Sequence, residues 1–212
     1  MGLFDAFRSK KVGGIFGYLG LDAFWLDLTE EQRALMTKYY RSCLGADRNG
    51  SPAEGHIERS SARPLQYLSA FIGWAVSDKQ YSLADVIVEH CNRIYPAASL
   101  IDQHFYLLTA TEGYYRQKKV RDDALDLAEK YALMDVELFP KYKGPLEKDM
   151  DGKLPRIPAF MQLSLIYEQT GRLQESVNIC KAALKNSLQD ESYGGYQGRI
   201  EKIQKKIDKV KT

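Results

Sequence analysis

The stretch AFMQLSLIYEQTGRLQESVNICKAAL, residues 159–184, decides the fold. On both sides of Gly171, apolar residues recur at intervals of three and four, which is the spacing of one face of an α-helix. Glycine readily adopts the left-handed conformation at a helix end. The stretch therefore predicts two helices, at about 158–170 and 173–187. A turn this short joins neighbouring helices as an antiparallel hairpin.

The same spacing continues through the rest of the chain. It predicts two further hairpins, which pair 63–77 with 81–95 and 99–117 with 121–138. Pro96 and Pro140 are expected to end the second helix of each pair, because proline cannot donate a helical hydrogen bond. No segment alternates with the period of a strand, so the sequence predicts an all-α protein.

Two more helices flank the hairpins. Thr29 and Gln32 have the spacing of a capping box, which predicts a helix start there. A final helix at about 197–211 carries isoleucines on one stripe and lysines elsewhere. That stripe can cover the last hairpin while the lysines stay in water. The alternative is a two-stranded coiled coil, for which two heptads are short.

The first two hairpins agree when they are superimposed with a shift of 40 residues. Five of seven compared positions are identical, and small residues open the second helix of each pair. The compared pairs are Leu68 and Leu108, Ala70 and Ala110, Gly73 and Gly113, Trp74 and Tyr114, Lys79 and Lys119, Ala84 and Ala124, and Val88 and Ala128.

The third hairpin resembles a tetratricopeptide repeat. The pattern is an aromatic, a leucine, a small residue and a tyrosine on the first helix, a glycine at the turn, and small residues on the second helix. Here it is carried by Phe160, Leu163, Ser164, Tyr167, Gly171, Ser176, Cys180 and Ala183. Ser176 stands in place of the usual alanine and Cys180 in place of the aromatic. The resemblance is strongest for 157–189 and weaker for 65–97 and 105–138.

The resemblance implies a right-handed superhelix of about three stacked hairpins, with a concave groove that binds a protein or peptide partner. In this family the groove is lined by the first helix of each repeat. The positions carried over are Gln66, Ser69, Gly73, Tyr106, Thr109, Gly113, Arg116, Met161, Leu165 and Glu168. Glycine is unfavourable inside a helix, so Gly73 and Gly113 suggest close approach by a ligand or by a neighbouring helix.

Breaks in composition suggest two domains. Residues 1–60 form an N-terminal helical region and linker, and 61–212 form the repeat domain, with the capping helix at 197–211. The proline-rich segment 139–157 is expected to be an inserted loop, either a contact element or a spacer.

Composition supplies no sign of an enzyme. The chain has 212 residues, a formal net charge of +2 and three widely separated cysteines, Cys43, Cys91 and Cys180. No metal-binding spacing or phosphate-binding loop is present, so we expect no catalytic residues, metal or cofactor. Cys91 and Cys180 fall on apolar helix faces. Free thiols of this kind and the absence of a secretory signal predict a cytoplasmic protein.

Three other readings remain open. A basic cluster at Lys118, Lys119 and Arg121, with a basic last helix, would suit a nucleic-acid-binding solenoid, although the overall charge is nearly balanced. A regulator that senses a short peptide is a second alternative. In residues 3–11, Leu3, Phe4 and Phe7 precede basic residues, which suits either a weak membrane anchor or a docked terminal turn.

Overall fold

A computed structural model describes residues 12–43, 45–190 and 192–210 of the chain, and the side chains up to residue 209. Throughout these ranges the regular elements are helices, as the sequence predicted. The contacts divide the chain into two units, Met1–Ala98 (unit 1) and Ser99–Thr212 (unit 2). The apolar segment near the N-terminus lies outside the described residues.

Unit 1 contains the predicted N-terminal region and the first predicted hairpin. Its helices are α1 (Gly14–Tyr18), α2 (Asp22–Asp27), α3 (Glu30–Ser42), α4 (Pro64–Ser77) and α5 (Tyr81–Ile94), followed by the short 3-10 helix η2 (Tyr95–Ala97). The predicted capping box is present at the start of α3: the Gln32 N–H donates to Thr29 Oγ1 over 3.2 Å, and the Thr29 N–H donates to Gln32 Oε1 over 2.9 Å.

An aromatic core joins the first helices of unit 1 to α4. The fully buried Phe16 ring lies 5.8 Å from Phe24 and 6.4 Å from Phe71, in edge-to-face geometry in both cases. Such pairs add to the free energy gained by burying the rings. Described residues of the N-terminal region therefore pack directly on the first hairpin.

Close backbone contacts hold the segment at α1 against the linker. The N–H groups of Gly13 and Gly14 donate to the carbonyls of Ala53 and Gly55, each over 2.8 Å. Gly14 has a φ of +56°, and a Cβ atom there would lie 2.6 Å from the carbonyl oxygens of Pro52 and Glu54. Only glycine fits at this position without moving the backbone.

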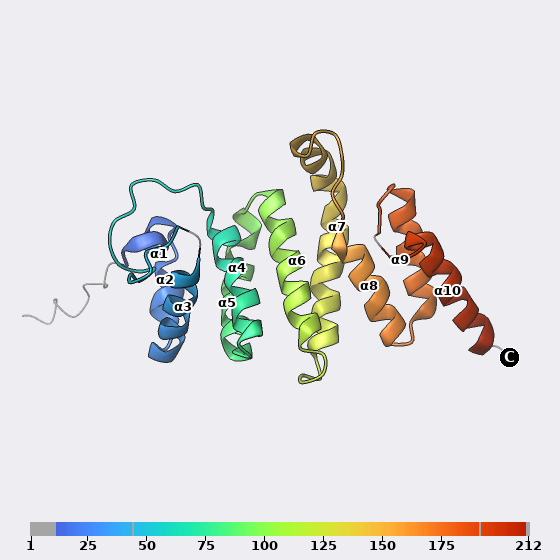
Figure 1. The fold of residues 1–212 in the computed structure, drawn as a ribbon, viewed down its shortest axis with the longest axis horizontal. Coiled ribbons are helices and arrows are strands. Elements are labelled where there is room, and N and C mark those ends of the chain that lie inside the picture. The colour runs from blue at the N-terminus through green and yellow to red at the C-terminus, as the bar shows by residue number, and fades with distance from the viewer. Residues whose placement is uncertain (1–11, 44, 191, 211–212) are drawn as a thin grey trace, which may run out of the picture. The chain divides into compact units, whose positions relative to one another are not determined.

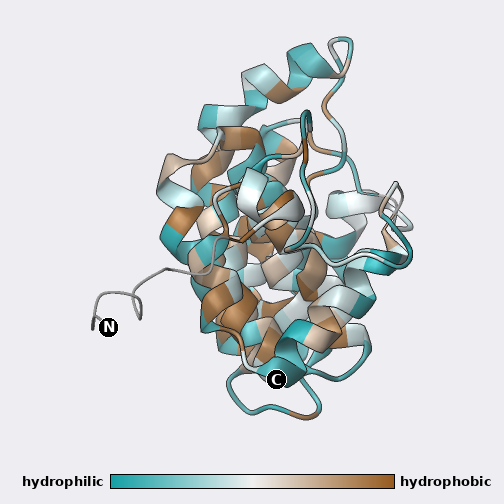
Figure 2. Cartoon of the chain, turned by 90° about the vertical axis from the view of Figure 1, so that its left-hand side faces the viewer, coloured by the Kyte–Doolittle hydropathy of each residue, from teal (hydrophilic) through white to brown (hydrophobic). Residues whose placement is uncertain are grey.

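Unit 2 is a series of helices in which each runs antiparallel to the next (Figure 1). They are α6 (Leu100–Arg116), α7 (Ala124–Asp149), α8 (Pro158–Gln169), α9 (Leu173–Lys185) and α10 (Gly195–Val210). Each helix contacts its successor, and α6 also contacts α8. Along the chain, hydrophobic residues are found mainly in the helices and hydrophilic residues mainly in the loops (Figure 2).

Small residues occupy the hairpin crossings, as predicted. Ala124 and Ala183 are fully buried in unit 2, and Ala84 is buried in unit 1. Gly171 has a φ of +78°, the left-handed conformation expected at the end of α8. Apart from the C-terminal end of α7, the helix bounds of the three hairpins lie within about three residues of the prediction.

The prediction of a loop over 139–157 was wrong for residues 139–149, and only 150–157 lies outside the helices. Helix α7 does not stop before Pro140; it continues through Pro140 and Pro145 to Asp149. Phe139, Tyr142 and Leu146 are buried at helical spacing across both prolines. Their burial compensates for the helical hydrogen bonds that the prolines cannot donate. The connection to α8 is thus the short segment 150–157.

Helix α10 covers the last hairpin by packing on α9. Ile203 is fully buried, Ile200 and Ile207 are half-buried, and Lys202, Lys205 and Lys209 are exposed. The isoleucine stripe is therefore used inside the chain, as a capping helix requires. The helix starts at Gly195, two residues earlier than predicted.

Candidate partner-binding site

Helices α6 and α8 lie side by side in unit 2. The Gln169 side-chain amide donates to the Tyr115 hydroxyl over 2.5 Å, which joins the last turns of the two helices. Both helices run in the same direction (Figure 1). We give the name α6–α8 face to a set of exposed and half-buried residues of these two helices. It contains Phe105, Thr109, Glu112, Arg116, Met161, Leu165 and Glu168.

The α6–α8 face combines apolar and charged side chains. Helical spacing places its four α6 residues on one stripe and its three α8 residues on another. Phe105 is 40% exposed, and Glu112 and Arg116 are exposed. Met161 and Leu165 are half-buried. The surface therefore offers apolar contacts next to both signs of charge.

The ten predicted partner-binding residues are divided between the two units. Gln66, Ser69 and Gly73 lie on α4 in unit 1, and the other seven lie on α6 and α8 in unit 2. Gln66 is exposed, but Ser69 is buried and its hydroxyl donates to the Gln66 carbonyl over 3.2 Å. A Cβ atom added at Gly73 would meet nothing within 4 Å. The close approach suggested by this glycine is absent from the described residues.

Two predicted residues of α6 point into the protein. Tyr106 is fully buried, and its ring lies 5.9 Å from Tyr131 of α7. Gly113 is also buried, and its carbonyl accepts a hydrogen bond from Gln117 over 3.1 Å. Like Ser69, these residues are inaccessible to a partner, because the apolar face of the hairpin turns them inward. Thr109, Arg116, Met161 and Leu165 stay predicted contact residues.

Glu168 is also a predicted contact, but α10 partly covers it. Its Oε1 atom lies 3.4 Å from Lys206 Nζ and 3.9 Å from Arg199 Nη2, and only 17% of its side chain is exposed. Lys206 stays exposed, as the sequence predicted, but its long side chain reaches the Glu168 carboxylate across α10 and α8.

A buried polar network joins α8, α9 and α10. The Ser164 and Ser176 hydroxyl oxygens lie 2.8 Å apart, and Cys180 Sγ lies 3.2 Å from Ser164 Oγ. Arg199 Nε donates to the same Ser164 oxygen over 2.6 Å. Sequence reasoning treated the serines and the cysteine as small packing residues and missed Arg199. The available signal was an arginine four residues before Ile203 on the buried stripe.

A second polar cluster joins α6 to α7. His104 Nδ1 lies 2.7 Å from Asp135 Oδ1, and the His104 ring stacks on Tyr142 with centroids 4.4 Å apart. Burial raises the pKa of Asp135, although the hydrogen-bonded His104 side chain acts in the opposite direction. Burial also raises the pKa of the Tyr142 hydroxyl.

This cluster contains residue types found in catalytic sites, but it lacks access. The side chains of His104 and Asp135 are 3% and 0% exposed. A general base must come within hydrogen-bond reach of a substrate proton. The pair therefore holds two helices together in this structure and presents no reactive atom to solvent.

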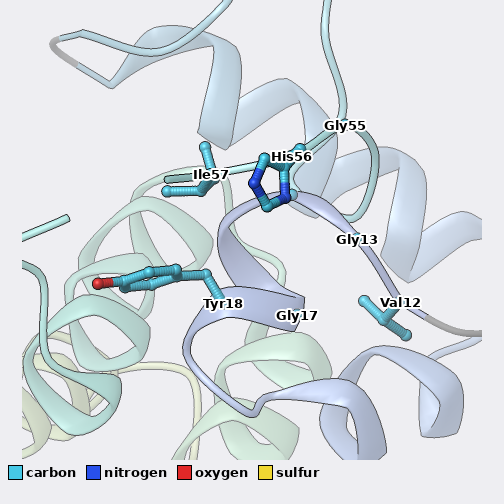
Figure 3. A pocket seen from close by; sticks show the side chains of 8 residues that line it. Val12, Gly13, Gly17, Tyr18, Gly55, His56 and Ile57 are labelled. Carbon is cyan, nitrogen blue, oxygen red and sulfur yellow. The ribbon is translucent and has the colours of Figure 1, made fainter. Parts of the chain in front are cut away.

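Cavities occur in both units. In unit 1, one of about 440 Å³ lies at the start of α1, where Tyr18, His56 and Ile57 surround a glycine-rich backbone (Figure 3). Another, of about 380 Å³, is lined partly by Cys43 and Tyr67. In unit 2, a cavity of about 560 Å³ lies beside the first half of α10. Across residues 12–43, 45–190 and 192–210, no group of three or more metal-ligating side chains is brought together.

The basic cluster at the α6–α7 turn is partly engaged within the protein. Lys118 Nζ lies 3.8 Å from the centroid of the Tyr115 ring. Arg121 pairs with the carboxylate of Asp123. These contacts reduce the charge that the turn can offer to phosphate groups.

Comparison with known proteins gives one full-length similarity. The chain is 26% identical over 201 residues to an uncharacterized protein of Aquifex aeolicus (strain VF5), which covers 93% of this chain and 96% of that protein. No family model and no solved structure matches the chain. Within the described part of the chain, every helix is too short or too polar to cross a lipid bilayer.

Proposed function

We propose that the chain is a tetratricopeptide-like interaction module that binds a segment of a partner protein on the α6–α8 face. The observation that carries the proposal is the parallel, side-by-side placement of α6 and α8, joined by the hydrogen bond from Gln169 to Tyr115. In stacked helical hairpins, neighbouring first helices form the surface that partners use.

The packing within unit 2 supports this proposal. Each helix is antiparallel to the next, buried alanines lie at the crossings, and α10 covers the end of the stack. The repeat identity and the superhelical arrangement are parts of the proposal. So is a cytoplasmic location, where the three free cysteines would stay reduced.

The chemistry of the face indicates the kind of segment that it binds. Phe105, Met161 and Leu165 offer apolar surface, and Glu112 and Arg116 flank it with opposite charges. An extended or helical peptide with apolar anchors and a few charged residues would match this surface. Such anchors carry most of the affinity in peptide recognition, and the charged rim mainly sets specificity.

The test is quantitative capture of partners from an extract of the cells that make the protein. The parent should retain one or more specific proteins, and Leu165→Asp or Arg116→Glu should reduce that retention. Lys181→Glu, an exposed substitution on α9, is the matched control and should leave capture unchanged. Circular dichroism must show equal helicity in all variants. Equal capture by the parent and both face variants would contradict the proposal.

A further inference from the structure

The cavity beside α10 is a second surface with a marked chemical character. It lies between the segment 192–194 and one side of the helix, where Gly198, Arg199, Glu201, Lys202 and Lys205 line it. Gly194 and Gly198 bring the segment and the helix together: a Cβ atom on Gly194 would lie 3.1 Å from the Gly198 Cα atom. None of the seven residues of the α6–α8 face lines this cavity, although Arg199, which does, lies 3.9 Å from Glu168 of that face.

Among the described residues, two unpaired basic side chains, Lys202 and Lys205, outnumber the one acidic side chain of this cavity, Glu201. Lys202 and Lys205 are exposed, and the described residues give neither of them an ion-pair partner. Arg199 is 13% exposed and already engaged: its Nη2 atom lies 3.9 Å from Glu168 Oε1, and its Nε atom donates to Ser164. The acidic member, Glu201, accepts a hydrogen bond from Gln197 over 3.1 Å.

Charge is also distributed unevenly along unit 2. Residues 195–210 contain five basic and two acidic residues, a net charge of +3, and residues 99–194 carry a net charge of −2. The positive charge is therefore concentrated on α10. A local field of one sign on an exposed helix favours association with a segment of opposite charge.

We infer that the α10 cavity binds an acidic peptide segment, with carboxylates on Lys202 and Lys205 and an apolar side chain against Tyr193. The two lysines are one helical turn apart, about 4.5 Å along the axis, which suits successive carboxylates of a peptide. Tyr193 is fully exposed and offers a ring next to the cations. A peptide can place its carboxylates opposite the two lysines only, whereas a nucleic acid carries a phosphate at every nucleotide. Glu201 in the cavity and Asp208 farther along α10 would repel such a continuous backbone, so a peptide fits better.

The experiment uses the full chain and a fluorescein-labelled peptide of sequence Glu-Glu-Phe-Asp-Glu-Leu-Glu-Glu, with binding followed by anisotropy at low ionic strength. The parent should bind, and added salt should weaken binding. Lys202→Glu with Lys205→Glu should weaken it about tenfold, because two favourable charge contacts become repulsive. The affinity of Lys202→Gln with Lys205→Gln should lie between that of the parent and that of the double glutamate variant.

A matched control separates local contact from overall charge. Lys181→Glu with Lys185→Glu makes the same change of net charge on exposed positions of α9 and should leave affinity nearly unchanged. Equal weakening by both reversed pairs would overturn the inference, as would no binding to the parent. Tighter binding of a single-stranded DNA octamer than of the peptide would overturn it in favour of nucleic acid. Leu165→Asp, which tests the α6–α8 face, is expected to have no effect on this probe.

Discussion

The hairpins α6–α7 and α8–α9 lie next to each other in unit 2, yet they fill their interiors with different chemistry. Between α6 and α7 lie large rings: Tyr114 stacks on Tyr131 with centroids 5.7 Å apart and planes 10° apart. Between α8 and α9, Ser164 and Ser176 meet through hydroxyl groups 2.8 Å apart. Apolar spacing predicts that a hairpin forms, but it does not predict which side chains pack where the two helices cross.

The two hairpins also differ in which helices supply their buried ionisable groups. In α6–α7, the His104–Asp135 pair is internal to the hairpin and almost fully buried. In α8–α9, the cation comes from outside the hairpin, because Arg199 belongs to α10. The first hairpin is therefore held by its own residues, and the second depends on the helix that covers it.

The largest expected effect is the loss of the buried pair in α6–α7. Asp135→Ala should lower the free energy of unfolding by about 3–5 kcal/mol, because it leaves His104 buried without its partner. The measurement is urea unfolding followed by circular dichroism. Replacing both residues, His104→Phe with Asp135→Leu, should cost clearly less than Asp135→Ala alone. A cost below about 1 kcal/mol for the single variant would show that the pair is not a structural link.

Overpacking tests the small residues that both crossings share. Ala124→Trp and Ala183→Trp should each reduce stability by about 1–3 kcal/mol, because both alanines are fully buried. Thermal melting of each variant against the parent gives the comparison. The exposed Ala70→Trp in α4 is the control and should have little effect. If both buried variants melt with the parent, the helix register is wrong.

Removing the arginine tests whether α8–α9 depends on α10. Arg199→Met keeps much of the side-chain volume but leaves Ser164 without its cationic donor and Glu168 with Lys206 alone. The expected cost is about 1–3 kcal/mol, together with faster proteolysis in residues 186–210. Limited proteolysis with mass spectrometry would locate the cuts. The opposite result, new cuts confined to α6–α7, would mean that the network does not hold α10.

The smallest expected effect is a difference in pH dependence. Burial raises the pKa of Asp135, so the folded state binds this proton more tightly than the unfolded state. Its contribution to stability is present below the unfolded pKa and is lost as the pH rises through the folded value. The stability of the parent relative to Asp135→Asn should therefore increase as the pH falls from 7 to 4. The stability difference between the parent and Ser164→Ala should not change with pH, because a serine hydroxyl does not titrate in this range. A pH-dependent difference in this control would contradict the assignment of the effect to Asp135.

The sequence predicted the local parts of this molecule well. The five helices α4, α5, α6, α8 and α9 follow apolar spacing, and the capping box at Thr29 and Gln32 is present. Such features depend on residues only a few positions apart. The continuation of α7 through Pro140 was missed because a proline rule was given more weight than the buried spacing of Phe139, Tyr142 and Leu146.

The parts that sequence reasoning missed are contacts between distant residues. His104 and Asp135 are 31 positions apart, and Arg199 and Ser164 are 35 apart. Nothing in their local sequence marks them as partners. Likewise, the family pattern carried Tyr106, Gly113 and Ser69 to a partner surface, although their burial depends on how each helix is rotated against its neighbours.

The two prolines inside α7 have a consequence for how this protein can change over time. Because Pro140 and Pro145 donate no N–H, the carbonyls of Val136 and Lys141 lack their usual helical donor. Bending α7 at these points therefore disrupts fewer hydrogen bonds than bending an uninterrupted helix. Residues 148–153 are exposed, so residues could be added or deleted there without disturbing the buried Leu146 or the pair at His104 and Asp135. The tip of α7 is thus the position at which related chains can differ in length while the stacked helices stay the same.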